Sequence, residues 1–242
     1  MLHIIVNADD FGISHDVNTA ICECFRKRII SSTTLMVNMP FADEAVEMAK
    51  SNGFDERVGL HLNLTSGMPM TQNIRRFKLF CKKDGRFNAA FEQNTCTRLR
   101  LGKKVSAAMY GEIDTQLHRY LEYGLPERHL DSHHHVHTDR AVYRVLMPLL
   151  HRYDIKSVRL SRNIYNHISM PKKLYKNRYN HTLRSRGLAK TDYFGSFRDF
   201  RENIDKIPDN SVVEIMLHPM YSSDGVLYDT HPPMSELTYF FA

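Results

Sequence analysis

Residues 3–12 read HIIVNADDFG, a short β-branched run that stops at two adjacent carboxylates and a glycine-containing turn. This pattern predicts a buried strand followed by a turn. Similar apolar runs occur at 31–38, 58–64, 129–133, 157–162 and 212–217, and helical periods lie between most of them. Strands that alternate with helices are typical of an α/β protein with a parallel sheet.

Polar residues at the carboxyl ends of these predicted strands favour a barrel over an open sheet. Asp9 and Asp10 end the first strand, and His61, His133 and His218 lie at or near the ends of three others. In a (β/α) barrel those ends converge on one mouth, where the connecting loops build the active site. Since no linker divides the chain, we expect residues 1–242 to form a single barrel domain.

Composition excludes several classes of protein. The 42% of hydrophobic residues and the 25 Phe and Tyr argue against disorder. The sequence contains no run of about 18 apolar residues, the length needed to span a membrane. The first residues also lack the features of a signal peptide. The cysteines form no CxxC pair, so we expect no disulfide framework and a cytoplasmic protein; they are Cys22, Cys24, Cys81 and Cys96.

The net charge of +6 is unevenly distributed along the chain. Residues 71–104 carry ten basic against two acidic side chains, residues 151–190 carry eleven against one, and the remainder is acidic. We interpret the segments at about 65–104 and 163–190 as basic inserts. Such segments suit a nucleic acid, a membrane surface or an anionic small substrate, and they equally suit solvated loops.

The stretch from 129 to 137, HLDSHHHVH, holds five of the fourteen histidines. On an extended backbone His129, Asp131, His133, His135 and His137 would share one side, whereas on a helix His133 and His137 would share a face. In either conformation several imidazoles can converge on one divalent cation, and Asp131 can orient one of them. The run therefore predicts a metal site.

The motifs together resemble the YdjC-like (ChbG) carbohydrate deacetylase family. The matching pieces, in order, are NADDFG at 7–12, STT at 32–34, GLHLNLT at 59–65, the histidine run, VRL at 158–160 and EIMLHP at 214–219. The resemblance implies a barrel of the glycoside hydrolase/deacetylase type. It also implies a metal-dependent hydrolase that removes N-acetyl groups from small sugars such as chitooligosaccharides.

The resemblance also implies roles for individual residues. The metal ligands would be Asp10, His61 and His133, the general base Asp9 and the general acid His218. Arg159 would orient Asp9, the alternative being an ordinary surface arginine. The family is associated with Mg²⁺, while Asp and His ligands also suit Zn²⁺. Because the chain ends at Ala242, sooner than the family pattern, we expect an irregular or incomplete last barrel unit.

The basic segments suggest that the acetylated sugar is phosphorylated, with Arg162, Lys172 and Lys173 as candidate contacts. Rival hypotheses are a phosphoesterase, a metal-binding barrel without turnover, and a nucleic-acid-binding protein that uses the basic segments. The last would leave the histidine run unexplained, so we do not expect nucleic acid as the partner. The sequence leaves open whether the chain forms a homo-oligomer.

Overall fold

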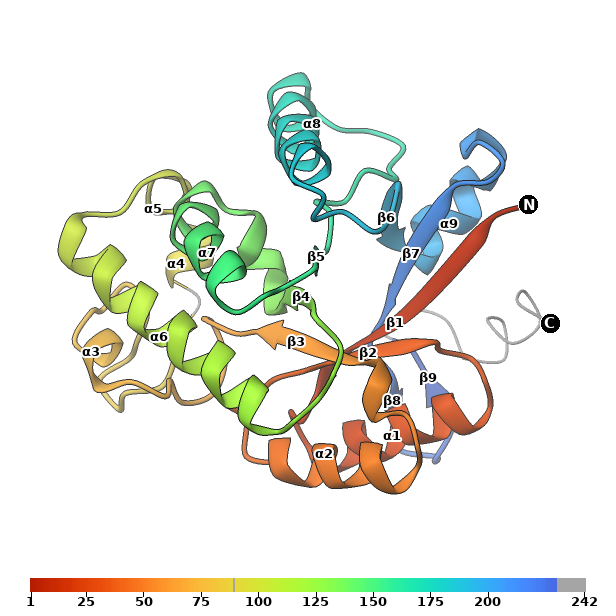
Figure 1. Ribbon diagram of the computed structural model, residues 1–242, viewed down its shortest axis with the longest axis horizontal. Coiled ribbons are helices and arrows are strands. Elements are labelled where there is room, and N and C mark those ends of the chain that lie inside the picture. Colours follow the sequence, from red (N-terminus) through yellow and green to blue (C-terminus); the bar gives the residue numbers. More distant parts are fainter. Residues whose placement is uncertain (89, 230–242) are drawn as a thin grey trace.

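Seven parallel strands form one curled sheet in the computed structural model, which describes residues 1–88 and 90–229 (Figure 1). The sheet order is β5-β4-β3-β2-β1-β7-β6. The strands are β1 (His3–Phe11), β2 (Ser32–Leu35), β3 (Val58–Leu62), β4 (His129–Ser132), β5 (Ser157–Val158), β6 (Tyr193–Ser196) and β7 (Val212–Leu217). Within the described residues β5 and β6 are the two edges, so the sheet is a half-barrel, which confirms the expected barrel-like α/β fold.

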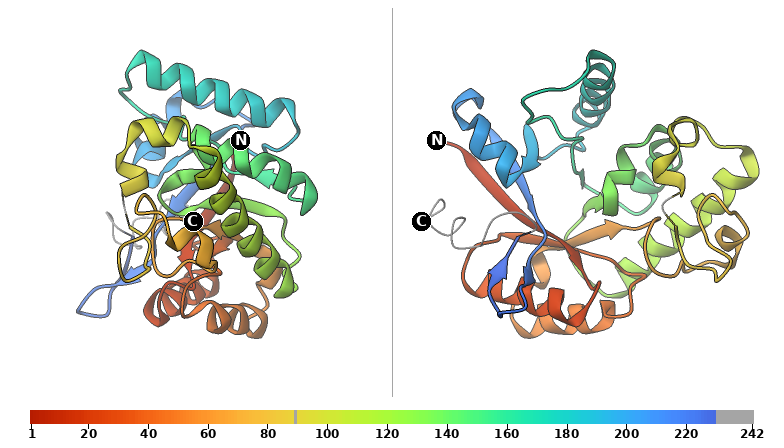
Figure 2. Two further views of the ribbon diagram at one scale, coloured as in Figure 1. Left: turned by 90° about the vertical axis from the view of Figure 1, so that its left-hand side faces the viewer. Right: turned by 180° about the vertical axis from the view of Figure 1, so that it is seen from behind.

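Helices cover the outer face of this sheet, as the views from the side and from behind show (Figure 2). They are α1 (His15–Arg26), α2 (Ala42–Ser51), α6 (Lys103–Glu122), α7 (Arg140–Arg152) and α9 (Phe197–Asn203). Their apolar faces pack on the sheet; in α1 the buried side chains include Ala20, Ile21 and Cys24. No helix in the described part of the chain combines the length and the apolar character needed to cross a membrane.

Before α6 begins, the described residues of the first basic segment form only short helices, in agreement with its lack of periodicity. These are α3 (Gln72–Arg75), α4 (Ala90–Gln93) and α5 (Thr95–Leu99). Two side-chain contacts attach the segment to the turn that follows β4: Glu92 Oε2 lies 2.6 Å from His134 Nδ1, and Arg98 Nη2 forms an ion pair with Asp139 Oδ1 at 2.7 Å. The segment therefore forms a wall beside the carboxyl end of β4.

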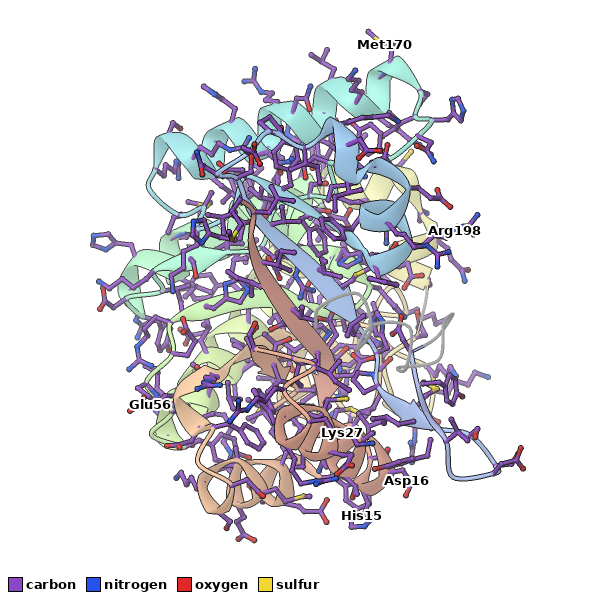
Figure 3. The ribbon with its side chains drawn as sticks, turned by 90° about the vertical axis from the view of Figure 1, so that its right-hand side faces the viewer. His15, Asp16, Lys27, Glu56, Met170 and Arg198 are labelled. Atoms are coloured by element: carbon purple, nitrogen blue, oxygen red, sulfur yellow. The ribbon has the colours of Figure 1, made fainter. Side chains whose placement is uncertain are left out.

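The second basic segment contains the helix α8 (Met170–Ser185), which the sequence pattern did not predict. Only Tyr179, Asn180 and Leu183 of this helix are buried, so its apolar period is too weak to be recognised. Figure 3 shows Met170, at the start of α8, projecting from the molecular surface. The short strand β6 was also missed, and the strand expected at 157–162 is reduced to the two residues of β5.

Smaller elements complete the described chain. The 3₁₀ elements are η1 (Asp55–Arg57), η2 (His133–Thr138) and η3 (Ile204–Lys206), of which η2 is interrupted by a kink. An antiparallel pair, β8 (Met220–Tyr221) and β9 (Leu227–Tyr228), follows β7 and contacts α1. The last barrel unit expected to be irregular falls partly on residues 230–242, which lie outside the described residues.

Candidate active site

Asp9 and Asp10 lie near the carboxyl end of β1, and their carboxylates have different surroundings. The register between β1 and β2 shifts between Ala8 and Phe11, and Asp10 adopts a left-handed backbone with φ of 68°. Gly12, with φ of 93°, makes the following turn, where an added Cβ would lie 3.2 Å from the Cα of Ala42. This irregular strand end buries Asp9 in the sheet interior and leaves Asp10 partly exposed.

Asp10, His61 and His133 come together from the ends of β1, β3 and β4. Asp10 Oδ1 lies 3.1 Å from His61 Nε2 and 2.7 Å from His133 Nδ1. One ligand atom from each residue lies within 4.8 Å of the others, a spacing that could hold one metal ion. The structure thus brings together the three residues that the sequence nominated as metal ligands.

Asp131 holds the His61 ring from the side opposite Asp10. His61 Nδ1 donates a hydrogen bond to Asp131 Oδ1 at 2.6 Å, which leaves Nε2 facing Asp10. Thr34 Oγ1 donates to the other oxygen of Asp131 at 3.0 Å. A carboxylate on the second ring nitrogen is the usual support of a metal-binding histidine, so this contact fits a metal ligand.

The local electrostatics favour a cation between these residues. Burial lowers the pKa of His61, but the charge of Asp131 and hydrogen bonds with Asp10 and Asp131 outweigh it and raise the pKa to about 10. Burial raises the pKa of Asp10, whereas its hydrogen bonds with His133 and His61 hold it well below the usual range. A divalent cation at this position would be attracted by the same carboxylates that raise the pKa of His61.

A second group of possible ligands, Asp9, His61 and Asp131, is less suitable for a metal. Both carboxylates already pair with Arg159, and all three residues are buried. Asp10 and His133 instead retain side-chain exposures of 16% and 12%. Only the group that contains Asp10 therefore offers donors that a substrate could also reach.

Arg159 is fully buried and joins three carboxylates in the interior of the half-barrel. Its Nη1 lies 2.7 Å from Asp131 Oδ2, its Nε donates to Glu214 Oε1 at 2.6 Å, and its two Nη atoms donate to both oxygens of Asp9. Burial lowers the pKa of Arg159, but the three carboxylates raise it well above the ordinary value. The alternative of an ordinary surface arginine is wrong.

Asp9 keeps one oxygen directed toward His218. Oδ1 accepts hydrogen bonds from Arg159 and from Asn7 Nδ2, the latter at 2.9 Å. Oδ2 accepts from Arg159 and lies 3.9 Å from His218 Nε2. His218 is 30% exposed, so its ring stands between the buried carboxylate and the solvent.

The histidine run follows neither conformation considered from the sequence, because after Ser132 it forms the 3₁₀ element η2, which a kink at His134 and His135 interrupts. His134 and His135 are left-handed, with φ of 52° and 54°, an uncommon conformation for histidine. His137 stabilises this turn through two hydrogen bonds. Its Nε2 donates to the Arg159 carbonyl at 3.2 Å, and its Nδ1 lies 2.5 Å from Ser132 Oγ. Burial lowers the pKa of His137 to about 3, so the ring is neutral.

The basic residues nominated from the sequence all lie on the connection between β5 and β6. Arg162 and Lys172 line a cavity of about 760 Å³ between α8, α5 and the turn after η2. Lys173 is exposed on α8 and does not line that cavity. The structure therefore brings two of the three residues together and leaves the third outside.

Sequence reasoning missed the function of Glu214 as a partner of Arg159. Along β7, Glu214 precedes His218 by four residues, so both positions fall on the same side of an extended chain. This alternation could have indicated that Glu214 faces the same side as His218. No local pattern shows that the partner of Glu214 is Arg159, 55 residues earlier. The structural role of His137 could likewise not be predicted, because it depends on a hydrogen bond to the carbonyl of Arg159, 22 residues away.

The fold and the site define a class: an α/β half-barrel with an Asp-His-His group that could hold a metal ion at the carboxyl ends of its parallel strands. The profile of the family described as YdjC-like protein matches residues 3–240. The chain therefore belongs to the YdjC-like family.

Relatives of known name agree with this assignment. A carbohydrate deacetylase from Clostridium beijerinckii is 30% identical over 246 residues, covering 98% of this chain and 90% of the relative. A carbohydrate deacetylase from Geobacillus stearothermophilus is 33% identical over 228 residues, covering 90% and 80%. A crystal structure from Enterococcus faecalis, described as a cellobiose-phosphate cleavage protein, has a TM-score of 0.68 at 23% identity, covering 98% of this chain and 88% of that one; it supports the fold.

Proposed function

We propose that this protein is a metal-dependent carbohydrate deacetylase that removes N-acetyl groups from small sugars of the chitooligosaccharide type. The observation that carries the proposal is the Asp10, His61 and His133 group beside the Arg159-held carboxylate of Asp9. Amide hydrolysis can use a metal ion as a Lewis acid together with a positioned carboxylate as a general base. The named relatives support the class of substrate.

The donor set fits a divalent cation. One carboxylate and two imidazoles are acceptable to Zn²⁺, and Mg²⁺ is the alternative that the family resemblance implies. When bound, such an ion supplies Lewis acidity toward a carbonyl oxygen and toward water. Asp131 would keep Nε2 of His61 turned toward the ion through the hydrogen bond at Nδ1.

Asp9 acts as the general base in this proposal. Arg159 and Asn7 occupy its other lone pairs, so the acceptor site that remains on Oδ2 points toward the side where His218 stands. Asp9 takes a proton from the attacking water there, and Arg159 fixes the carboxylate in that orientation. A carboxylate that cannot rotate spends no free energy on alignment during the reaction.

His218 acts as the general acid. Its 30% exposure places the ring where a substrate nitrogen can approach, and its distance of 3.9 Å from Asp9 Oδ2 lets the two groups act on the same bond. The imidazolium donates its proton to the departing amine as the C–N bond breaks. Acetate and a free amino sugar leave, and the proton lost from water is matched by the one gained by nitrogen.

The test is acetate release from a panel of N-acetylated mono- and disaccharides after reconstitution with Mg²⁺ or Zn²⁺. We expect release from at least one small acetylated sugar, with one free amine formed per acetate. Release from none of them by fully metallated protein would overturn the proposal. We further propose that the reaction occurs in the cytoplasm, where the four cysteines, free thiols in the structure, would stay reduced.

A further inference from the structure

His218, the proposed general acid, stands where the chain leaves the sheet. The pairing of β7 with β1 ends at Leu217, which lies opposite Ala8. The backbone N–H of His218 therefore needs a partner outside the sheet, because a buried donor without one is costly. Asp229 supplies this partner, since its Oδ1 accepts a hydrogen bond from the His218 N–H at 2.6 Å.

A hairpin brings Asp229 back to this point, although it lies 11 residues later in the chain. The chain runs out through β8 and returns through β9, so that Met220 lies opposite Tyr228. The hairpin lies beside α1 and contacts it (Figures 1 and 2), and its Leu227 is buried in the core. The position of Asp229 is thus determined by a folded element that packs on the rest of the protein.

The carboxylate of Asp229 is itself buried, with an exposure of 5%. Its charge is among those that raise the pKa of Cys24, a buried residue of α1, although burial is the larger cause of that shift to about 12. Asp229 therefore lies near both the end of β7 and α1. A carboxylate removed from water depends on its hydrogen bonds, and one from a backbone N–H is of the strong, charge-assisted kind.

The backbone of His218 is restricted on its other side by Pro219. A residue that precedes proline is confined largely to extended conformations. Among the described residues, the His218 ring makes no hydrogen bond of its own, and its Nε2 lies 3.9 Å from Asp9 Oδ2. The place of the ring beside Asp9 therefore depends on how the backbone of His218 is held.

We propose that Asp229 is a positioning residue, which holds the proposed general acid in place through the hydrogen bond to the His218 N–H. The inference rests on the proposed function, because it assigns the support of the group that protonates the departing amine. Asp229 is not part of the metal-ligand group. Since a misplacement of about 1 Å can lower a rate about 100-fold, loss of this hydrogen bond acts on kcat.

The first test measures acetate release from an N-acetylated disaccharide by the metal-reconstituted full chain. Asp229→Ala removes the acceptor, so kcat should fall by roughly 10- to 100-fold while KM and metal content stay near those of the wild type. Asp229→Asn keeps an oxygen that can accept the same hydrogen bond, and should retain most of kcat. Asp224→Ala, at an exposed position between β8 and β9, should leave kcat unchanged.

The second test separates positioning of His218 from general support of the fold. His218→Ala removes the acid, and adding Asp229→Ala to it should lower kcat no further, because Asp229 acts through His218. A residue that only stabilises the fold would lower kcat by the same factor with and without His218. Equal factors in the two backgrounds would overturn the inference.

Wild-type kcat in Asp229→Ala would also overturn the inference, while leaving the deacetylase intact. Absence of acetate release by the wild type would contradict the proposed function instead. Asp229→Asn keeps the inference falsifiable should the alanine variant fail to fold. Retention of kcat in Asp229→Asn supports the hydrogen bond, and a loss as large as that in His218→Ala contradicts it.

Discussion

Arg159 and Asp9 form a doubly hydrogen-bonded ion pair, in which Nη1 lies 2.7 Å from Oδ2 and Nη2 lies 2.7 Å from Oδ1. Both side chains are almost inaccessible, with exposures of 0% and 2%. Asp9 belongs to the central strand β1, whereas Arg159 follows the edge strand β5, so the pair spans the concave interior of the sheet. We therefore expect it to support both the fold and the proposed base.

Replacing Arg159 by alanine should lower the free energy of unfolding severely. The change leaves Asp9, Asp131 and Glu214 without their shared cation, and removing one partner from a buried ion pair costs about 3–5 kcal/mol. Urea unfolding followed by circular dichroism measures the loss. The control is Arg152→Ala, which breaks an exposed pair with Asp114 and should leave stability close to that of the wild type. Equal stability of the two variants would refute the structural importance of Arg159.

Asp9→Asn should keep the metal but lose turnover. The amide has nearly the shape of the carboxylate but cannot accept the proton of water, so kcat should fall by about 10²- to 10⁴-fold. The measurement is kcat at saturating substrate together with metal content. Asp16→Asn, on the exposed first turn of α1, should retain wild-type kcat. If Asp9→Asn also retained it, Asp9 would not be the base.

His61→Ala and His133→Ala should each lower metal content and activity together, because each removes one of three ligand candidates. Metal analysis after dialysis, combined with acetate release, checks this expectation. His134→Ala provides a matched control within the same run, since His134 is directed toward Glu92 and is not part of the ligand group. Full metal occupancy in His133→Ala would remove His133 from the ligand set.

Asp131→Asn should weaken metal binding although Asp131 itself is not expected to touch the metal. The loss of the charged acceptor for His61 Nδ1 should raise the metal Kd by about 10- to 100-fold, as for other supporting carboxylates. Competition with a metal indicator measures that Kd. The exposed Asp154→Asn variant serves as the reference. An unchanged Kd in Asp131→Asn would show that the hydrogen bond does not support a ligand.

Much of the fold could be predicted because the buried strands leave a clear pattern. Val212–Leu217 is predicted with its observed bounds, and the polar residues that end β1, β3 and β4 do meet in space. The helix α8 could not be predicted, since few of its side chains are buried. The left-handed turn at His134 and His135 was also missed, because it depends on tertiary hydrogen bonds such as that from His137 to the Arg159 carbonyl.

We propose that a divalent metal held by Asp10, His61 and His133 enables this chain to deacetylate a small sugar. The most direct measurement is the release of acetate and free amine from N-acetylated disaccharides by chelator-treated protein, before and after Mg²⁺ or Zn²⁺ is restored. We predict negligible release without metal and recovery, with one amine per acetate, when one equivalent of metal is bound. Full activity in protein shown to be metal-free would contradict the claim.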